Sequence, residues 1–137
     1  MSKFTWPQIV SFSRSAAAYL AEDEKRKDTK LGYAIKRVTQ QLEKLQSEYL
    51  QQREDIQINN AATDKDGVLL TETGGDLRYT PDGLKMRNKL WRELDEREIF
   101  EVEPYFTTEA PELSEEYQRA FSGFVVKPEE SRLEAVA

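Results

Sequence analysis

The sequence predicts an α+β protein: a long antiparallel helical hairpin with a small antiparallel β-sheet and a third helix packed on it. Two observations carry this prediction. Apolar residues recur at helical spacing through the first part of the chain, and turn-forming residues later separate short apolar runs of strand length. A chain of 137 residues is long enough for one modest core. We therefore expect a single domain over residues 1–126 and a frayed tail over residues 127–137.

The first helix is expected from about Pro7 to Glu24. Thr5 precedes it as an N-cap, and Pro7 lies in the first turn, where its missing N–H costs nothing. Apolar residues then follow at steps of three and four: Ile9, Phe12, Ala16, Tyr19 and Leu20. This spacing is typical of one apolar helix face.

The second helix, Lys30 to about Ile56, carries the strongest pattern in the chain. Its apolar residues alternate steps of four and three, which is the spacing of a coiled-coil seam: Leu31, Ile35, Val38, Leu42, Leu45 and Tyr49. The short connection through Asp28 and Thr29 favours an antiparallel hairpin with the first helix. The second helix is longer, so the part of its stripe around Leu45, Tyr49 and Ile56 must be covered by the rest of the domain or by a second chain. We expect self-association through these three residues.

The sheet is expected from three short segments. Val68–Thr71 and Leu77–Thr80 flank the turn formers Gly74 and Gly75, which indicates a β-hairpin. A further strand is expected within Ile99–Phe106, with Pro104 marking its edge or end.

Two more helices are expected. Thr80 and Pro81 repeat the signal of the first helix and predict a third, from Pro81 to about Asp95. A short last helix follows Ser114, with Gly123 near its end. The predicted core combines the stripe of the second helix with apolar residues elsewhere: Ile9, Phe12, Leu84, Leu90, Trp91, Leu94 and Val102.

The composition argues against catalysis. The chain has no His and no Cys, which are the usual ligands of zinc and copper and the commonest acid-base and thiol groups of enzymes. Asp64, Asp66 and Gly67 resemble part of a calcium loop, but Ala62 and Thr73 stand where that loop needs acidic ligands. The glycines match no phosphate-binding motif. We expect no enzyme activity, no cofactor and no metal site.

Charge is distributed unevenly along the chain. The formal net charge is −6, yet the stretch from Glu93 to Glu116 holds ten acidic residues against the single base Arg97. Such a segment is suited to complementary protein contacts, where charge sets orientation and encounter rate. The partner-binding residues predicted within it are Glu96, Glu98, Glu101 and Glu103. A solvated surface without a partner is the plainer interpretation.

Part of the chain resembles a group of small tailed-phage proteins of unknown function. The resemblance runs roughly from Leu31 to Phe106, through "KLGYAIKRVTQQLEKLQSEYLQQREDI", "DKDGV", "LRYTPDGLKMRNKLWREL" and "EVEPYF". It implies a phage or mobile-element origin and carries over no catalytic residue.

These observations together predict a non-catalytic protein-interaction protein that acts as a virion or assembly component. One alternative is a phage-encoded inhibitor of a host defence or nucleic-acid-handling protein, acting through the acidic segment. A second is a nucleic-acid-binding accessory that uses the basic third helix with Trp91 or Tyr79 as stacking groups. An isoelectric point near 4.9 opposes this last alternative. No signal peptide or membrane span is recognisable, so we expect the protein in the host cytoplasm or the virion. The apolar stripe of the second helix leads us to expect a homo-oligomer.

Overall fold

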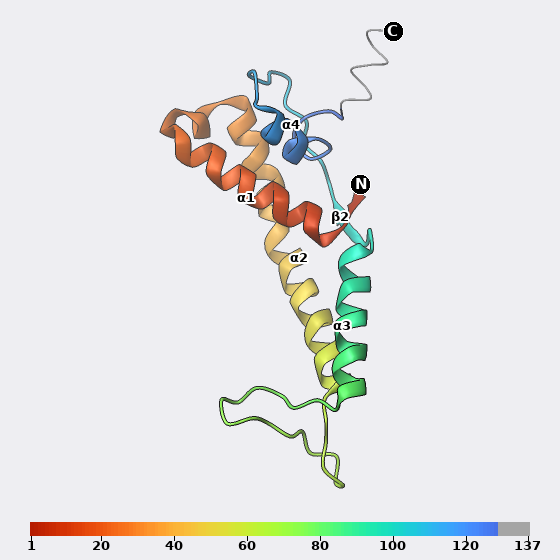
Figure 1. The fold of residues 1–137 in the computed structure, drawn as a ribbon. Helices are drawn as coiled ribbons and strands as arrows, with labels where there is room; N and C mark the ends of the chain where they lie inside the picture. The colour runs from red at the N-terminus through yellow and green to blue at the C-terminus, as the bar shows by residue number, and fades with distance from the viewer. Residues whose placement is uncertain (129–137) are drawn as a thin grey trace. The chain divides into compact units, whose positions relative to one another are not determined.

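The computed structural model describes residues 1–128. This part of the chain is mostly helical, with four α-helices and a two-stranded antiparallel sheet (Figure 1). In chain order the elements are β1 (Ser2–Phe4), α1 (Trp6–Glu22), the 3-10 helix η1 (Glu24–Asp28), α2 (Lys30–Asn60), α3 (Pro81–Glu96), β2 (Phe100–Val102) and α4 (Glu115–Phe121). Within residues 1–128, none of the helices is both long and apolar enough to cross a membrane.

The chain divides into two compact units. The first consists of Met1–Leu45 and the chain from Glu98 onward, and the second is Gln46–Arg97. Helix α2 supplies residues to both. The single domain expected over residues 1–126 stays a prediction. Most of the expected tail, residues 129–137, lies outside the described residues.

The helix starts read from the sequence are confirmed. The Thr5 hydroxyl accepts a hydrogen bond from the Gln8 N–H at 3.3 Å, and the Gln8 side chain accepts one from the Thr5 N–H at 2.8 Å. This reciprocal pair is a capping box. Thr80 caps α3 through the Gly83 N–H, and Ser114 caps α4 through the Tyr117 N–H. Helix α2 begins at Lys30 as expected, but it runs one turn further than predicted, to Asn60.

A close backbone approach forms the connection between α1 and α2. Thr29 caps α2, since its hydroxyl accepts a hydrogen bond from the Gly32 N–H at 3.0 Å. A Cβ atom on Gly32 would lie 2.1 Å from the carbonyl oxygen of Arg26. The turn of η1 can therefore fold onto the start of α2 only because residue 32 has no side chain.

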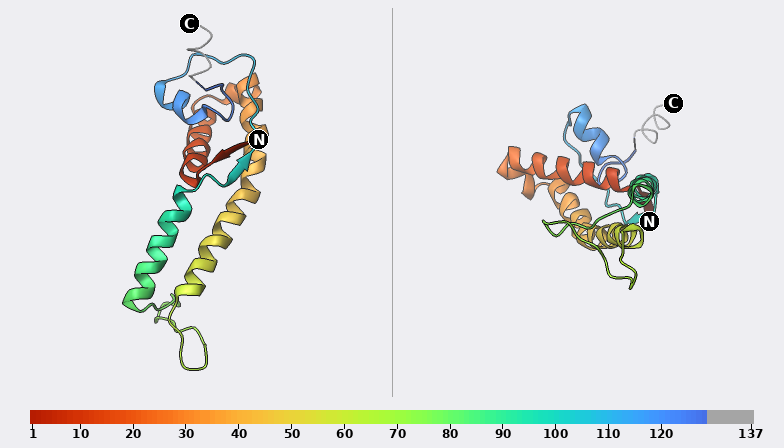
Figure 2. Two further views of the ribbon diagram at one scale, coloured as in Figure 1. Left: turned by 90° about the vertical axis from the view of Figure 1, so that its right-hand side faces the viewer. Right: turned by 60° about the horizontal axis from the view of Figure 1, so that its bottom comes forward.

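The predicted sheet is wrong in its strand partners. Strand β2 pairs with β1, at the N-terminus, in an antiparallel register that places Ser2 opposite Val102 and Phe4 opposite Phe100 (Figure 2). The segments around Gly74 and Gly75 form an isolated bridge between Thr71 and Leu77 and do not join this sheet. The stretch "SKF" is too short for alternation to show in the sequence, whereas its Phe4 side chain is buried in the core.

The core of the first unit is rich in aromatic rings. Phe124 stacks between Phe4, at a centroid distance of 4.0 Å, and Phe12, at 4.6 Å. Phe121 meets Phe12 edge-on at 5.8 Å and Tyr19 at 5.7 Å. These contacts hold α4 and the residues after it against α1. The predicted core omitted most of them, together with Phe100, Val125 and Val126, which are buried as well.

The second unit is an antiparallel pair formed by α3 and the second half of α2, seen side by side in both figures (Figures 1 and 2). The Trp91 indole N–H donates to the Arg53 carbonyl at 3.1 Å, and the Tyr49 hydroxyl donates to Asp95 at 2.6 Å. Leu94 is buried as predicted, but Leu84 is 41% exposed. Leu90 and Trp91 are half-buried.

Three of the backbone hydrogen bonds in the loop between α2 and α3 join segments that are distant along the loop. The Ala62 N–H donates to the Arg78 carbonyl at 2.8 Å, the Leu70 N–H to the Ala62 carbonyl at 3.0 Å, and the Arg78 N–H to the Leu70 carbonyl at 2.9 Å. Three segments are thus joined in a closed cycle. The two intervening turns project beyond the ends of the helix pair (Figure 2).

Candidate functional site

Two rows of side chains, exposed except for the half-buried Gln41, lie next to each other in the first unit. Tyr33, Arg37 and Gln41 follow each other at steps of four on α2, and such residues share one face of a helix. Glu101, Glu103 and Tyr105 alternate along the extended segment that includes β2, and such residues share one face of a strand. Phe100 and Val102, which alternate with these residues on the other face of β2, are buried, and this directs the row outward. We name these six residues the contact face.

A cluster of two tyrosines and an arginine joins the two rows. The rings of Tyr33 and Tyr105 meet edge-on at a centroid distance of 5.6 Å. The guanidinium of Arg37 lies 5.2 Å from the centre of the Tyr105 ring and donates a hydrogen bond to the Tyr33 hydroxyl at 3.2 Å. Tyr33 is 47% exposed and Tyr105 39%. Two large rings are therefore held in fixed positions while their surfaces stay open to solvent.

Gln41 fastens the extended segment to α2. Its side-chain N–H donates to the Glu103 carbonyl at 2.8 Å, and its side-chain oxygen accepts from the Glu103 N–H at 2.8 Å. One amide thus satisfies both backbone groups of Glu103, as a neighbouring strand would. This clamp leaves the Glu103 carboxylate free to face solvent.

The charges of the contact face are partly balanced by local partners. The hydrogen bond to Tyr33 raises the pKa of Arg37 above its ordinary value, and the nearby Tyr105 and Glu103 act in the same direction. Lys3 stands opposite Glu101 in the sheet register. Between residues 98 and 116 there are seven glutamates and no Lys or Arg. The segment that supplies the strand row of the face therefore carries an excess of negative charge.

The four predicted partner-binding residues are all exposed, but they are not one group. Glu101 and Glu103 belong to the contact face, and Glu98 precedes β2 in the same unit. Glu96 is the last residue of α3 and belongs to the second unit. Partner binding by these residues stays a prediction.

The residues predicted for self-association are largely covered within the single chain. Leu45 is 8% exposed and Tyr49 4%, and Ile56 is half-buried. The Tyr49 hydroxyl is held between Asp95 at 2.6 Å and Arg53 at 3.2 Å. Self-association through Leu45 and Tyr49 stays a prediction, and their burial gives it no support.

Sequence reasoning missed the part of the contact face that α2 supplies. Neither Arg37 and Gln41 nor Tyr105 was among the site residues predicted from the sequence. The available signal was the four-residue spacing of Tyr33, Arg37 and Gln41, which marks one helix face. The partner of that face is distant in the sequence and could not be read from it.

The second unit contains a stack of arginine and aromatic side chains. The guanidinium of Arg53 lies 3.9 Å from the centre of the Trp91 ring and that of Arg87 4.2 Å from it. Arg87 also lies 4.7 Å from the centre of the Tyr79 ring. The rings proposed as stacking groups for nucleic-acid bases are thus already covered by arginines. This arrangement weighs against the nucleic-acid alternative.

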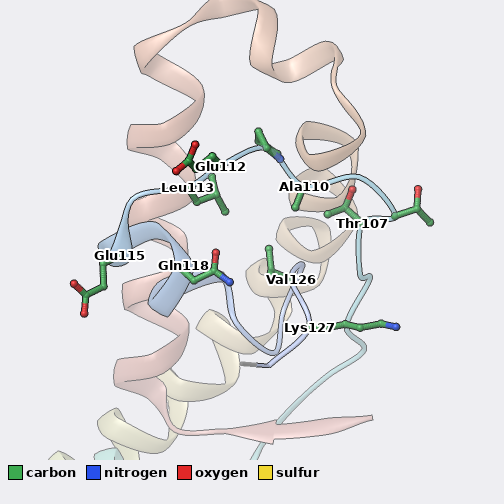
Figure 3. A pocket seen from close by; sticks show the side chains of 10 residues that line it. Thr107, Ala110, Glu112, Leu113, Glu115, Gln118, Val126 and Lys127 are labelled. Atoms are coloured by element: carbon green, nitrogen blue, oxygen red, sulfur yellow. The ribbon is translucent and has the colours of Figure 1, made fainter. Parts of the chain in front are cut away.

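A cavity of about 590 Å³ lies between the loop after β2, helix α4 and Val126 (Figure 3). Leu113, Gln118 and Val126 point into it, whereas the charged ends of Glu115 and Lys127 point away. The side chains that enter the cavity do not form a catalytic set. Within the described residues, no group of three or more acidic side chains could hold a metal ion.

No protein-family model, curated protein or solved structure matches this chain.

Proposed function

We propose that this is a non-catalytic protein-interaction protein that binds its partner through the contact face. The observation that carries the proposal is the exposed cluster of Tyr33, Arg37 and Tyr105. Tyrosine and arginine are enriched among the residues that dominate binding energy, because they offer large contact area and several hydrogen bonds. Here their mutual contacts hold them in place, so little side-chain entropy remains to be lost on binding.

The neighbouring glutamates supply the second element of the proposal. Glu101 and Glu103 flank the aromatic cluster at strand spacing and add directional charge at its rim. Rim charges steer the encounter and set its salt dependence more than they set affinity. The resemblance to tailed-phage proteins makes a virion or assembly protein the proposed partner. Inhibition of a host protein through the same acidic residues is the alternative.

The test compares charge reversal on and off the contact face. Glu101→Lys with Glu103→Lys, and separately Tyr105→Ala, should each reduce partner capture from infected or host cell extract at least ten-fold, as read by quantitative mass spectrometry. Glu43→Lys with Glu112→Lys is the matched control, because both residues are exposed and lie off the face. Unchanged capture by the face variants at moderate salt, with intact circular dichroism spectra, would refute the proposal.

Capture also separates the two proposed partners. A structural or assembly role predicts enrichment of a virion protein from infected cells alone. Inhibition of a host protein predicts the same captured protein from infected and uninfected cells.

A further inference from the structure

A second cavity adjoins the contact face and has a different chemistry from the cavity beside α4. Its volume is about 370 Å³, within the range of small-ligand sites. Aromatic rings, hydroxyl groups and two charged residues line it: Asp28, Thr29, Lys30, Tyr33, Tyr105, Phe106, Thr107 and Thr108. Tyr33 and Tyr105 therefore belong both to the contact face and to the wall of this cavity.

The charges at this cavity leave one carboxylate without a partner. Lys30 is neutralised by Glu109, at a distance of 3.1 Å. The Asp28 carboxylate, in contrast, makes no ion pair or hydrogen bond with any other residue of the part of the chain that the structure describes. Asp28 ends η1, where the chain turns into α2. Among the residues that line the cavity, the one unpaired charge is thus negative.

The other wall groups also favour a cation. The faces of tyrosine and phenylalanine rings attract ammonium and guanidinium groups, by about 0.5–1 kcal/mol at exposed sites. Arg37, which lies over Tyr105, is not among the residues that line the cavity. Glu103, two residues before Tyr105 in the extended segment, is exposed and adds a negative charge near this site.

We infer that this cavity receives an arginine or lysine side chain from the protein that binds the contact face. This inference rests on the proposed function and specifies it, because it names a basic segment as the element that is recognised. The Asp28 carboxylate pairs with the incoming cation, and the rings of Tyr33 and Tyr105 pack against its aliphatic stem. A basic side chain seated here brings its own backbone alongside Glu103 and Tyr105.

The experiment uses a blocked Gly-Arg-Gly tripeptide as the probe and the full chain as the receptor. Amide NMR shifts of Tyr33, Tyr105 and Thr107 should change and saturate at millimolar peptide. The same tripeptide with citrulline in place of arginine has nearly the same shape without the charge. It should bind at least three-fold more weakly to the unaltered protein, so this comparison does not depend on any variant folding.

Two substitutions locate the effect. Asp28→Asn and Tyr105→Phe should be compared, since the first removes the charge and the second keeps the ring. We expect Asp28→Asn to weaken the arginine peptide at least three-fold and Tyr105→Phe to leave it nearly unchanged, with Glu43→Gln as a control for non-specific charge. Equal binding of both peptides, no saturable shift, or equal effects of Asp28→Asn and Glu43→Gln would each overturn the inference.

The outcome is separable from that of the proposed function. If tripeptide binding fails while partner capture still depends on Glu101, Glu103 and Tyr105, the inference that the cavity receives a basic side chain is wrong and the contact face stands. If the tripeptide binds but capture is insensitive to those residues, the contact face itself is wrong.

Discussion

Tyr79 has a buried hydroxyl that finds no hydrogen-bond partner among the described residues. A polar group left in this way costs about 1–3 kcal/mol of desolvation without compensation. We therefore expect Tyr79→Phe to leave the free energy of unfolding unchanged or to raise it by about 1 kcal/mol. Urea unfolding followed by circular dichroism measures this change.

Tyr49→Phe is the matched control for this substitution. Its hydroxyl donates to Asp95 and accepts from Arg53, and burial followed by the hydrogen bond to Asp95 raises the pKa of Tyr49. Its removal should cost about 1.5–3 kcal/mol, because one partner is a carboxylate. A Tyr79→Phe variant as unstable as Tyr49→Phe would show that the Tyr79 hydroxyl has a partner in solution.

Gly32 offers a second test at a single position. A Cβ atom there would lie 2.1 Å from the Arg26 carbonyl oxygen and 2.9 Å from the backbone of Lys27. Alanine favours helix by about 1 kcal/mol over glycine, yet we expect Gly32→Ala to lower stability by about 1–3 kcal/mol through this overlap. Gly74→Ala, where a Cβ meets nothing within 4 Å, should change stability by less than about 1 kcal/mol. A stabilising Gly32→Ala would contradict the close packing of η1 on α2.

The contact between α1 and α4 makes its own prediction about pH. The Glu22 carboxylate accepts hydrogen bonds from the Tyr117 hydroxyl and from the Arg26 guanidinium. Both bonds lower the pKa of Glu22 below its ordinary value of 4.5, and the bond from Tyr117 has the larger effect. A lowered folded-state pKa stabilises the fold above pH 4.5, and this contribution is lost as the pH falls through the folded-state value. The same hydrogen bond raises the pKa of Tyr117, so its contribution holds below pH 10.0 and is lost in more alkaline solution.

Glu22→Gln should therefore flatten the loss of stability on acidification below pH 4.5. Thermal unfolding between pH 3 and pH 7 compares this variant with Glu112→Gln, which changes an exposed glutamate of the same unit. An identical pH profile for the Glu22 variant and the unaltered protein would show that the contact with Tyr117 is not populated in solution.

The oligomeric state tests the whole chain. Leu45 and Tyr49, which were predicted to form a seam between copies, are buried in the single chain. This burial favours a monomer at tens of micromolar by light scattering, in place of the homo-oligomer expected from the sequence, and Leu45→Glu should unfold the protein because it places a charge in a buried site. Leu50→Glu, at a side chain that is 54% exposed, should leave it folded. A dimer that Leu50→Glu dissociates would instead show that the exposed side of α2 is the seam.

The starts of the helices and the stripe of α2 could be predicted from the sequence. Thr5, Thr80 and Ser114 act through hydrogen bonds that reach only three residues along the chain. Both partners of such a hydrogen bond lie in one short segment, so the residue types of that segment are enough to predict where the helix begins. The apolar spacing in α2 is also a local pattern. It predicts which side of the helix is buried, but it does not predict which other residues cover that side.

Only the tertiary structure decided which surfaces meet. The sheet pairs β1 with β2, which lie far apart in the sequence, and Phe124 is buried between Phe4 and Phe12. The contact face likewise joins a row on a helix and a row on a strand. The spacing of each row can be seen in the sequence, but the contact between the two rows cannot. Local patterns determined the helices of this protein and the buried side of α2. Which apolar surfaces pack together is decided by the hydrophobic effect, which has no preferred direction and depends on the whole chain. The tertiary structure was therefore needed to show which buried sides meet and which residues form the contact face.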